Sequence, residues 1–556
     1  MKTIYFHCNF DKPEDLSNKV KSCIIENNLA EIISFESDKI QNFLPHKYSH
    51  ELPDRLLIPT IFKFNNGSTY DGVEFALQWY FHLLNLKHNF SIVLLGIEDK
   101  GAFFEHCNYS HFAKCPNVFY VNQNISAIKT FIDSHQYLEY NIDNCIKSIK
   151  RIGIKAPTSY KSHHSITNEW SVYRWCNFLN IHNEFLDKLS NEINESLYYN
   201  YLKAIYPIEI TSEPTNYKIL KQGNILLIDD EIEKGWEEFF ISLMTANQRF
   251  DSIGKDFKKK SIDDIVESSI EKVKNFNPDV VILDLRLHED DFDNKTANEL
   301  TGVKILKKIK DFNKGVQVLI FTASNKVWNY IELQLNGIDG FVLKESPEQS
   351  KERKFTQNAI LNLKNDIEYG LDSAKFLKEI YYKSKECIEH IDELKKLKVI
   401  DKDFVGAIRT FLNLAFDSLI NKKGEYQYDS SFMYYFFILE ASSKQFIDED
   451  NPICENDKYK FEFRKISNRL KSFNTENGVK TSYDYVSNNR RIDYNQKFYN
   501  LIDLAGLPSI NPINLVQLRN DFNHPNLVEN KRIALVKKEN IKEVFLVCYK
   551  LLMSLS

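Results

Sequence analysis

The stretch "PDVVILDLRL", residues 278–287, decides the fold. Its apolar run at 280–283 is followed at once by an acid, Asp284. Short continuous apolar runs are typical of strands that are buried on both faces, as in parallel sheets. The end of such a strand lies at the sheet edge where α/β proteins bind ligands. The stretch therefore predicts a buried parallel strand that brings Asp284 to a ligand-binding edge.

Three further apolar runs have the same character, and they alternate with helical patterns. The runs are "NILLIDDE" (224–231), "VQVLIFTAS" (316–324) and "GFVLKES" (340–346). Apolar residues recur at helical spacing between them, at 261–276, 301–312 and 325–337. Strands that alternate with amphipathic helices form βαβ units around a parallel sheet. We therefore expect a doubly wound, flavodoxin-like domain.

The polar residues at the predicted strand ends form a chemically coherent set. Asp229, Asp230 and Asp284 would repel one another unless a cation lies between them, and Mg²⁺ prefers such oxygen ligands. A lysine, Lys344, can pair with an anion, and the hydroxyl of Thr322 can donate to it. Together these groups predict a site that moves a phosphoryl group onto a carboxylate.

The four motifs "LLIDDE", "ILDLRL", "FTAS" and "GFVLKES" resemble, in this order, those of the response-regulator receiver domain of two-component systems. The resemblance implies a phosphoprotein in which Asp284 accepts the phosphoryl group. Asp229 and Asp230, with Asp284 and the backbone carbonyl of Arg286, would hold Mg²⁺. It further implies a histidine kinase or another phosphodonor as partner.

The same resemblance assigns the remaining residues of the site. Thr322 would move toward the phosphoryl group, Lys344 would bind it, and Phe341 would be the aromatic switch residue. Two features depart from the family pattern: the acidic loop 284–302 is longer than usual, and Glu345 stands where the family usually has proline. The second departure puts the usual cis peptide bond there in doubt.

Residues 1–137 have a weakened form of the same layout. Strands are expected at 2–8, 56–64, 91–97 and 117–122, with a helix at 70–85. The acids are missing, because Lys63 and Phe64 stand before the helix and no lysine follows the last strand. This pattern predicts a pseudo-receiver; an unrelated Rossmannoid domain is the alternative.

The sequence between and beyond these domains is predicted to be helical. A helical connector is expected at 138–218, with His163 and His164 in a solvated loop. From about residue 350 onward the apolar spacing is that of a helical bundle. The predicted divisions are an N-terminal domain at 1–137, the connector at 138–218, a receiver domain at 219–372 and a helical domain at 373–556.

One motif in the last domain contains residues that could act in catalysis. In "LRNDFNHP" (518–525), Arg519 lies in a predicted helix and His524 lies at its end, since Pro525 disfavours helical geometry before it. Histidine can serve as an acid or base near neutral pH, and arginine can stabilise a phosphate, so the pair suits RNA cleavage without metal. A capping histidine and a salt-bridged arginine is the plainer interpretation.

The stretch resembles the R-x4-6-H motif of HEPN ribonucleases. By that likeness Arg519 and His524 are catalytic, Asn520 assists, no cofactor is needed, and two motifs face each other across a homodimer. Basic side chains nearby are candidates for holding the RNA backbone. They are Arg490, Arg491, Lys531, Arg532, Lys537 and Lys538.

Composition restricts the cellular setting. The net charge of −5 argues against a wholly basic nucleic-acid coat. The nine cysteines are scattered without a CxxC pair, which disfavours a zinc ribbon and fits a reducing cytoplasm. No apolar stretch approaches the length of a membrane span, and no signal peptide is evident at the start.

These observations favour a phosphorylation-controlled response regulator whose output is RNA cleavage, in stress response or antiviral (phage) defence. The alternative is a non-enzymatic signalling adaptor, with a working receiver and a HEPN-like bundle used for dimerisation or partner binding. A transcriptional regulator ranks last, because no helix-turn-helix with a basic recognition helix is evident.

Overall fold

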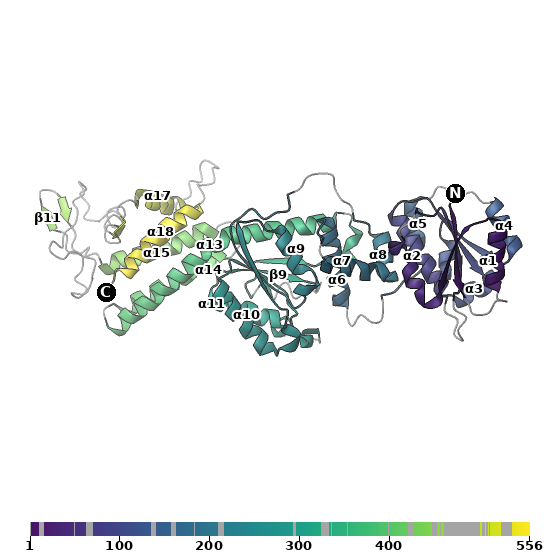
Figure 1. Cartoon of the computed structure of the whole chain (residues 1–556). Coiled ribbons are helices and arrows are strands. Elements are labelled where there is room, and N and C mark those ends of the chain that lie inside the picture. Colours follow the sequence, from purple (N-terminus) through teal and green to yellow (C-terminus); the bar gives the residue numbers. More distant parts are fainter. Residues whose placement is uncertain are drawn as a thin grey trace.

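The computed structural model is elongated, and its parts follow one another along a single axis (Figure 1). An N-terminal sheet unit and a C-terminal helical bundle lie at the two ends, with connecting helices and a central sheet unit between them. The structure describes residues 2–9, 16–48, 51–62, 70–134, 141–156, 163–182, 184–208, 216–292, 296–323, 333–334, 336–352, 354–398, 400–420, 427–446, 453–455, 458–460, 501–502, 506–507, 510, 512–523 and 536–555.

The central unit is the predicted doubly wound parallel sheet. Its five strands have the order β10-β9-β8-β6-β7, and every neighbouring pair is parallel. The strands are β6 (Gly223–Ile228), β7 (Gln248–Ile253), β8 (Val280–Leu283), β9 (Gln317–Thr322) and β10 (Gly340–Leu343). The helices are α9 (Trp236–Leu243), α10 (Ile262–Phe276), α11 (Thr301–Phe312) and the first part of α13 (Phe355–Lys396).

Alternate residues of each strand enter different cores, which explains the layers. On β6, Leu226 and Ile228 pack with α10 and α11, whereas Ile225 and Leu227 pack with α9 and α13. Both faces of the sheet are therefore buried, as the continuous apolar runs predict. The predicted helix 325–337 lies largely outside the described residues.

The N-terminal unit repeats this topology. Its five parallel strands have the order β2-β1-β3-β4-β5, which is the order of the central sheet when that sheet is numbered along the chain. The strands are β1 (Thr3–Asn9), β2 (Glu31–Glu36), β3 (Arg55–Pro59), β4 (Ser91–Gly96) and β5 (Val118–Asn122). The helices are α1 (Leu16–Glu26), α2 (Asp71–Asn85), α3 (Lys100–His106) and α4 (Ile125–Ser134).

A close helix–strand contact occurs in both units. A Cβ atom added to Gly72 of α2 would lie 1.8 Å from the carbonyl oxygen of Pro59, and one added to Gly302 of α11 would lie 2.3 Å from that of Asp284. Only glycine allows the helix to approach the strand end so closely. Lys63 and Phe64, expected in the second strand of this unit, lie outside the described residues.

The described residues of the connector form four helices. The helices are α5 (Ile142–Ile149), α6 (His163–Phe178), α7 (Glu184–Glu195) and α8 (Leu197–Ile205). The expectation of a loop at His163 and His164 is wrong, because α6 begins at His163. Apolar and polar residues of α6 are buried together, so its sequence lacks the one-sided pattern that marks a surface helix.

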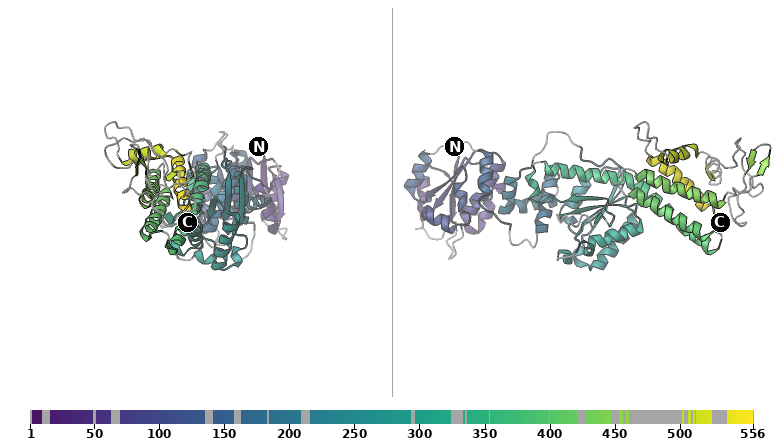
Figure 2. Two further views of the ribbon diagram at one scale, coloured as in Figure 1. Left: turned by 90° about the vertical axis from the view of Figure 1, so that its left-hand side faces the viewer. Right: turned by 180° about the vertical axis from the view of Figure 1, so that it is seen from behind.

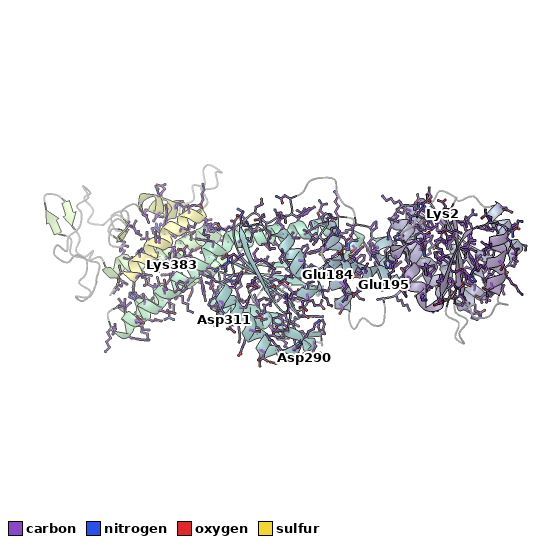
Figure 3. The ribbon with its side chains drawn as sticks, viewed as in Figure 1. Lys2, Glu184, Glu195, Asp290, Asp311 and Lys383 are labelled. Atoms are coloured by element: carbon purple, nitrogen blue, oxygen red, sulfur yellow. The ribbon has the colours of Figure 1, made fainter. Side chains whose placement is uncertain are left out.

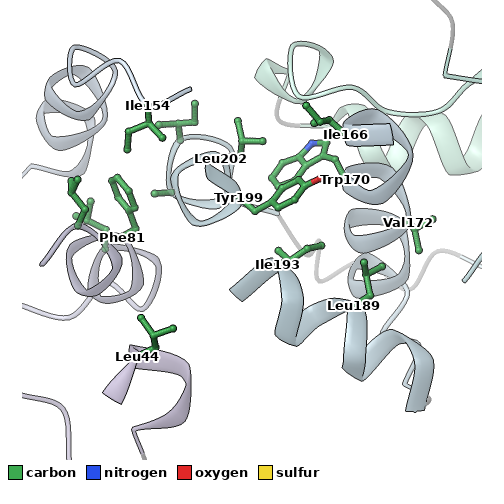
Figure 4. Close-up of a cluster of buried hydrophobic side chains, with 14 of the residues drawn as sticks. Leu44, Phe81, Ile154, Ile166, Trp170, Val172, Leu189, Ile193, Tyr199 and Leu202 are labelled. Carbon is green, nitrogen blue, oxygen red and sulfur yellow. The ribbon is translucent and has the colours of Figure 1, made fainter. Parts of the chain in front are cut away.

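One core runs from the N-terminal unit through the connector to the central sheet. Figure 4 shows Phe81 of α2 near Leu202 of α8, and Tyr199 of α8 stacked near Trp170 of α6. The rings of Trp170 and Tyr199 are nearly parallel, with centroids 6.1 Å apart. Apolar contact at both ends of the connector therefore joins the two sheet units.

The described residues of the C-terminal part are helical, as predicted, apart from a short hairpin. α14 (Lys402–Ile420), α15 (Gln427–Phe446), α17 (Pro512–Asn523) and α18 (Lys538–Met553) pack with the second part of α13. The strands β11 (Ile453–Glu455) and β12 (Lys458–Lys460) pair antiparallel and correct the expectation of helices alone. The predicted boundary between residues 372 and 373 falls inside α13.

The bundle meets the central unit at the amino ends of the strands. Nζ of Lys378 on α13 lies 2.9 Å from Oδ1 of Asp279, which precedes β8. Nζ of Lys314, which precedes β9, lies 3.3 Å from Oδ1 of Asp417 on α14. Asp311 lies on this side of the central unit, whereas Asp290 lies nearer the connector (Figure 3). Seen from behind, the bundle and the connector again lie at opposite ends of the central unit (Figure 2).

Among the described helices, none has both the length and the apolarity needed to cross a membrane.

Candidate functional site

The predicted site residues of the central sheet meet at one edge. Asp229 follows β6, Asp284 follows β8, Thr322 ends β9 and Lys344 follows β10. All four side chains are buried. Since these four strands are neighbours in a parallel sheet, their carboxyl ends bring the residues together as predicted.

Lys344 lies between two carboxylates. Its Nζ donates to Oδ2 of Asp229 and to Oδ2 of Asp284, both at 2.9 Å. Burial alone would lower the pKa of Lys344, but the two carboxylates outweigh it and raise the pKa, so the ammonium stays charged. The site therefore contains a fixed, dehydrated positive charge beside Asp284.

The three acids form a cluster that suits a divalent cation. One ligand oxygen from each of Asp229, Asp230 and Asp284 lies within 4.8 Å of the others, the only such cluster found in the described part of the chain. Burial raises the pKa of Asp229 to about 6 and that of Asp230 well above its usual range. Oδ1 of Asp230 is buried without a hydrogen-bond partner. A hard cation such as Mg²⁺ would satisfy that oxygen and relieve the repulsion.

The backbone orients Asp284. Its Oδ1 accepts hydrogen bonds from the backbone N–H groups of Leu285 at 2.6 Å and Arg286 at 3.4 Å. With Oδ1 held by the chain itself, Oδ2 faces Lys344. The carboxylate is thus fixed in one orientation, with one oxygen toward the fixed charge.

The long acidic loop after Asp284 is organised by one of its own acids. Asp291 is fully buried, and its Oδ2 accepts from the backbone N–H groups of Leu287 at 3.0 Å and His288 at 3.1 Å. Its Oδ1 accepts from the N–H and the hydroxyl of Thr301, both at 3.1 Å. Asp291 therefore ties the loop to the start of α11; residues 293–295 are outside the described part.

Phe341 and Glu345 flank Lys344. Phe341 is half-buried on β10, opposite Ile320 of β9, and packs with the core on the α11 side. Glu345 is fully buried, and no cis peptide bond is found in the described residues. Sequence reasoning noticed Glu345 only as a departure from the family pattern and did not identify its partners.

Trp236 is a site residue that sequence reasoning missed. The Nζ of Lys344 lies 5.2 Å from the ring centroid of Trp236 and 5.0 Å from that of Phe321. Aromatic faces stabilise a nearby ammonium, more so when water is excluded. No local sequence pattern marks Trp236, because the contact joins positions far apart in the chain.

The corresponding edge of the N-terminal sheet is filled by an aromatic side chain. Gly96 ends β4 where Thr322 ends β9, and Tyr120 on β5 corresponds in register to Phe341. A Cβ atom on Gly96 would lie 1.9 Å from Oη of Tyr120, which donates to the carbonyl oxygen of Glu98 at 2.9 Å. Tyr120 thus occupies the space that a side chain at position 96 would need.

The predicted RNase pair is only partly described. Arg519 lies on α17, half-buried, with Nη2 3.2 Å from Oε1 of Glu440 on α15, and its guanidinium lies over the ring of Phe436. Its Nη1 donates to Oδ1 of Asn520 at 3.2 Å. His524 lies outside the described residues.

The candidate RNA-binding residues are mostly undescribed as well. Arg490, Arg491, Lys531 and Arg532 fall outside the described residues. Lys537 precedes α18. Lys538 is turned toward α13, where its Nζ donates to the carbonyl oxygen of Asp372 at 2.9 Å, and burial lowers its pKa.

Comparison with known proteins finds structural similarity over part of the chain. No family model matches the sequence, and no curated protein sequence matches it. A LuxR-family two-component response regulator from Aurantimonas sp. SI85-9A1 is similar over 26% of this chain and 86% of its own, with 17% identity and a TM-score of 0.19. The isolated REC domain of RcsB from Salmonella enterica serovar Typhimurium is similar over 26% of this chain and 89% of its own, with 18% identity and a TM-score of 0.17. Both similarities cover only part of this chain, and the chemistry of the site is inferred from its own geometry.

Proposed function

We propose that this chain is a phosphorylation-controlled regulator in which Asp284 accepts a phosphoryl group and the C-terminal bundle cleaves RNA. The observation that carries the first part is the contact of Lys344 with Asp229 and Asp284, beside the orphaned oxygen of Asp230. A positive charge and a cation-binding acid cluster on either side of one oriented carboxylate are what phosphoryl transfer to that carboxylate requires.

The proposed step is a displacement at phosphorus. An oxygen of Asp284 forms the new bond to phosphorus while the bond from phosphorus to the donor breaks, and the leaving group takes that electron pair. Lys344 neutralises oxygen charge on the transferred group, and the hydroxyl of Thr322, at the end of the adjacent strand, lies on the same edge. Mg²⁺, held by Asp229, Asp230, Asp284 and the carbonyl of Arg286, would supply the remaining charge. A histidine kinase or a small phosphodonor would be the source.

Binding of beryllofluoride, a mimic of an acyl phosphate, tests this part. Beryllofluoride with Mg²⁺ should raise the melting temperature, because a ligand of the native state stabilises it by mass action. Asp284→Asn should abolish the rise. Asp290→Asn is the matched control, since Asp290 is an exposed acid of the same loop whose change should leave the rise intact.

The proposed output is metal-independent RNA cleavage by Arg519, His524 and Asn520, with two motifs facing each other in a homodimer. Arg519 supplies a half-buried guanidinium against Phe436, an environment in which a fixed charge can act on a phosphate. His524 would move protons near neutral pH. A role in stress response or phage defence follows from the family likeness alone.

The output is tested with total RNA as substrate. Arg519→Ala and His524→Ala should each abolish cleavage, whereas Arg409→Ala should not. Arg409 is the matched control because it is an exposed arginine of the same bundle that pairs with Asp392. Cleavage that persists in both active-site variants would exclude this site.

A signalling adaptor remains the second candidate, and one observation favours it. The ion pair of Arg519 with Glu440 and the packing on Phe436 are also the contacts of a purely structural arginine. In that case the central unit would still bind beryllofluoride, and the bundle would serve in dimerisation or partner binding without cleaving RNA.

A further inference from the structure

Helix α6 of the connector lies against the site of the central unit. Glu231 directly follows Asp230, and its carboxylate accepts a hydrogen bond from the amide of Asn168 on α6. Glu345 directly follows Lys344, and its carboxylate accepts from side chains of α6 as well. Two of the three loops that present charged groups to the site, those after β6 and β10, are therefore attached to the same helix.

Glu345 is the stronger of the two attachments. Its carboxylate is fully buried and accepts from four side chains. The donors are Arg174 Nε at 2.6 Å, Trp175 Nε1 at 3.0 Å, Ser350 Oγ at 2.6 Å and Thr356 Oγ1 at 2.8 Å. A buried carboxylate is tolerated when it is paired and fully hydrogen-bonded, as this one is. The backbone next to Lys344 is thus fixed to α6.

Aromatic rings connect α6 to the ammonium itself. The rings of Trp236 and Phe321 face Nζ of Lys344. The ring of Trp175 packs on both, with centroids 5.7 Å from Trp236 and 5.9 Å from Phe321. Trp175 therefore forms the outer wall of the aromatic cluster that surrounds the lysine.

Asn168 completes the connection from the other side. Its Nδ2 donates to Oε2 of Glu231, and its Oδ1 accepts from Nε1 of Trp236 at 2.8 Å. The same amide thereby holds the loop after Asp230 and the orientation of the Trp236 ring. Asn168 is itself fully buried, so water does not compete for these bonds.

We propose that Arg174 and Trp175 are positioning residues for Lys344, so that the connector helix α6 completes the phosphoryl-binding pocket of the central unit. This inference rests on the proposed phosphoacceptor function. In the structure the ammonium is bound by Asp229 and Asp284, and it must reorient to meet an anion on Asp284. The hydrogen bonds to Glu345 and the packing of Trp175 on the aromatic rings fix the position from which the ammonium reorients.

The coupling works in both directions. If the docked α6 strengthens anion binding, then anion binding must strengthen the docking of α6 by the same factor. α6 packs on α8, and α8 packs on α2 of the N-terminal unit. Occupancy of the site would thus affect the connector and the N-terminal unit, and it would also affect α13, because Thr356 of α13 donates to Glu345 and the second part of this helix packs in the bundle.

The variants that test this proposal leave the three acids untouched. The double variant Arg174→Met/Glu345→Gln removes both charges, which avoids an unpaired buried charge. Trp175→Leu removes the aromatic wall, and Trp175→Phe keeps a ring and is the milder change. Lys378→Met is the matched control, because it breaks an ion pair with Asp279 in the same unit at the opposite edge of the sheet.

Three quantities are measured on the full chain: melting temperature without ligand, Mg²⁺ affinity, and beryllofluoride affinity in saturating Mg²⁺. We expect the double variant and Trp175→Leu to bind beryllofluoride roughly 5- to 150-fold more weakly, the usual range of such coupling, with Mg²⁺ affinity unchanged. Trp175→Phe should show a smaller loss, and Lys378→Met none. If Trp175→Leu fails to fold, the double variant and Trp175→Phe still decide the question.

Two results would overturn the proposal, and they differ from failure of the proposed function. Wild-type affinity for beryllofluoride in the double variant and in both Trp175 variants would show that α6 does not position Lys344. If Mg²⁺ affinity falls by the same factor as beryllofluoride affinity and the melting temperature without ligand falls as well, these residues have a structural role only. By contrast, wild-type protein that binds no beryllofluoride would contradict the phosphoacceptor function itself.

Discussion

The ammonium of Lys344 and the carboxylate of Asp284 form a hydrogen-bonded ion pair of 2.9 Å from which water is excluded, since neither side chain is exposed. The same ammonium also pairs with Asp229. One positive charge therefore faces two buried carboxylates, and the third acid, Asp230, has an oxygen without a partner. Both the stability of the site and its demand for a cation follow from this arrangement.

Removing that charge should destabilise the protein in a way that Mg²⁺ relieves. Without metal, Lys344→Met should lower the free energy of unfolding by about 3–5 kcal/mol, the usual result of leaving one side of a buried ion pair. Added Mg²⁺ should recover part of the loss, because it replaces the missing charge. Lys310→Met, which breaks the pair with Asp339 in the same unit, should be destabilising without such recovery. Equal urea denaturation midpoints for Lys344→Met and wild type in EDTA would contradict this account.

Acid should weaken the contact between the N-terminal unit and the connector. Burial, together with nearby Lys203 and His46, lowers the pKa of His82 to about 4. Between that value and the ordinary 6.5, the unfolded chain binds the proton and the folded chain does not. Stability due to His82 is therefore present above pH 6.5 and is lost as the pH falls toward 4. His82→Gln should reduce the change of melting temperature with pH between these values. If the melting temperature changes with pH as in wild type, another group causes that dependence.

Two glycines in long helices should respond in opposite directions to alanine. A Cβ atom on Gly370 of α13 would lie 2.9 Å from Cγ2 of Val280, so Gly370→Ala overpacks the helix on the sheet and should cost about 1–3 kcal/mol, partly offset by helix propensity. Gly406 of α14 has open space, so Gly406→Ala should stabilise by about 1 kcal/mol. Chemical denaturation of both variants gives the comparison, and the same sign for both would contradict the packing described.

RNA cleavage should proceed without metal at the bundle. In EDTA, the wild type should leave cyclic or 3′-phosphate ends, because a site of arginine and histidine uses the neighbouring 2′-hydroxyl. Arg519→Lys should lose roughly 10²- to 10³-fold in rate, since lysine lacks the fixed fork of the guanidinium. Products with 5′-phosphate ends, or complete loss of cleavage in EDTA, would indicate a different nuclease chemistry.

The strand-end site could be predicted from sequence because its geometry is determined by topology. Each of Asp229, Asp284, Thr322 and Lys344 ends or follows an apolar run, and a parallel sheet brings such ends to one edge. The edge strand β7 was missed because its residues are largely half-buried and polar, "QRFDSI", so no apolar run marks it.

The contribution of the connector could not be predicted, because it depends on contacts between distant positions. Arg174 and Glu345 are separated by 171 residues, and nothing local in "SVYRWCNF" distinguishes a buried arginine from an exposed one. The same holds in the bundle, where Arg519 and Glu440 are 79 residues apart. Pairing of this kind is decided by packing and becomes visible only in the folded chain.

Phosphorylation of Asp284 can be detected in the mass of the intact protein. Wild-type protein incubated with a small phosphodonor and Mg²⁺ should gain the mass of one phosphoryl group, located at Asp284 by peptide mapping and absent when EDTA is added. Asp284→Asn should gain nothing, and Asp290→Asn should be labelled like wild type. Wild type that stays unlabelled, or Asp284→Asn labelled to the same extent, would contradict the assignment of Asp284 as the phosphoacceptor.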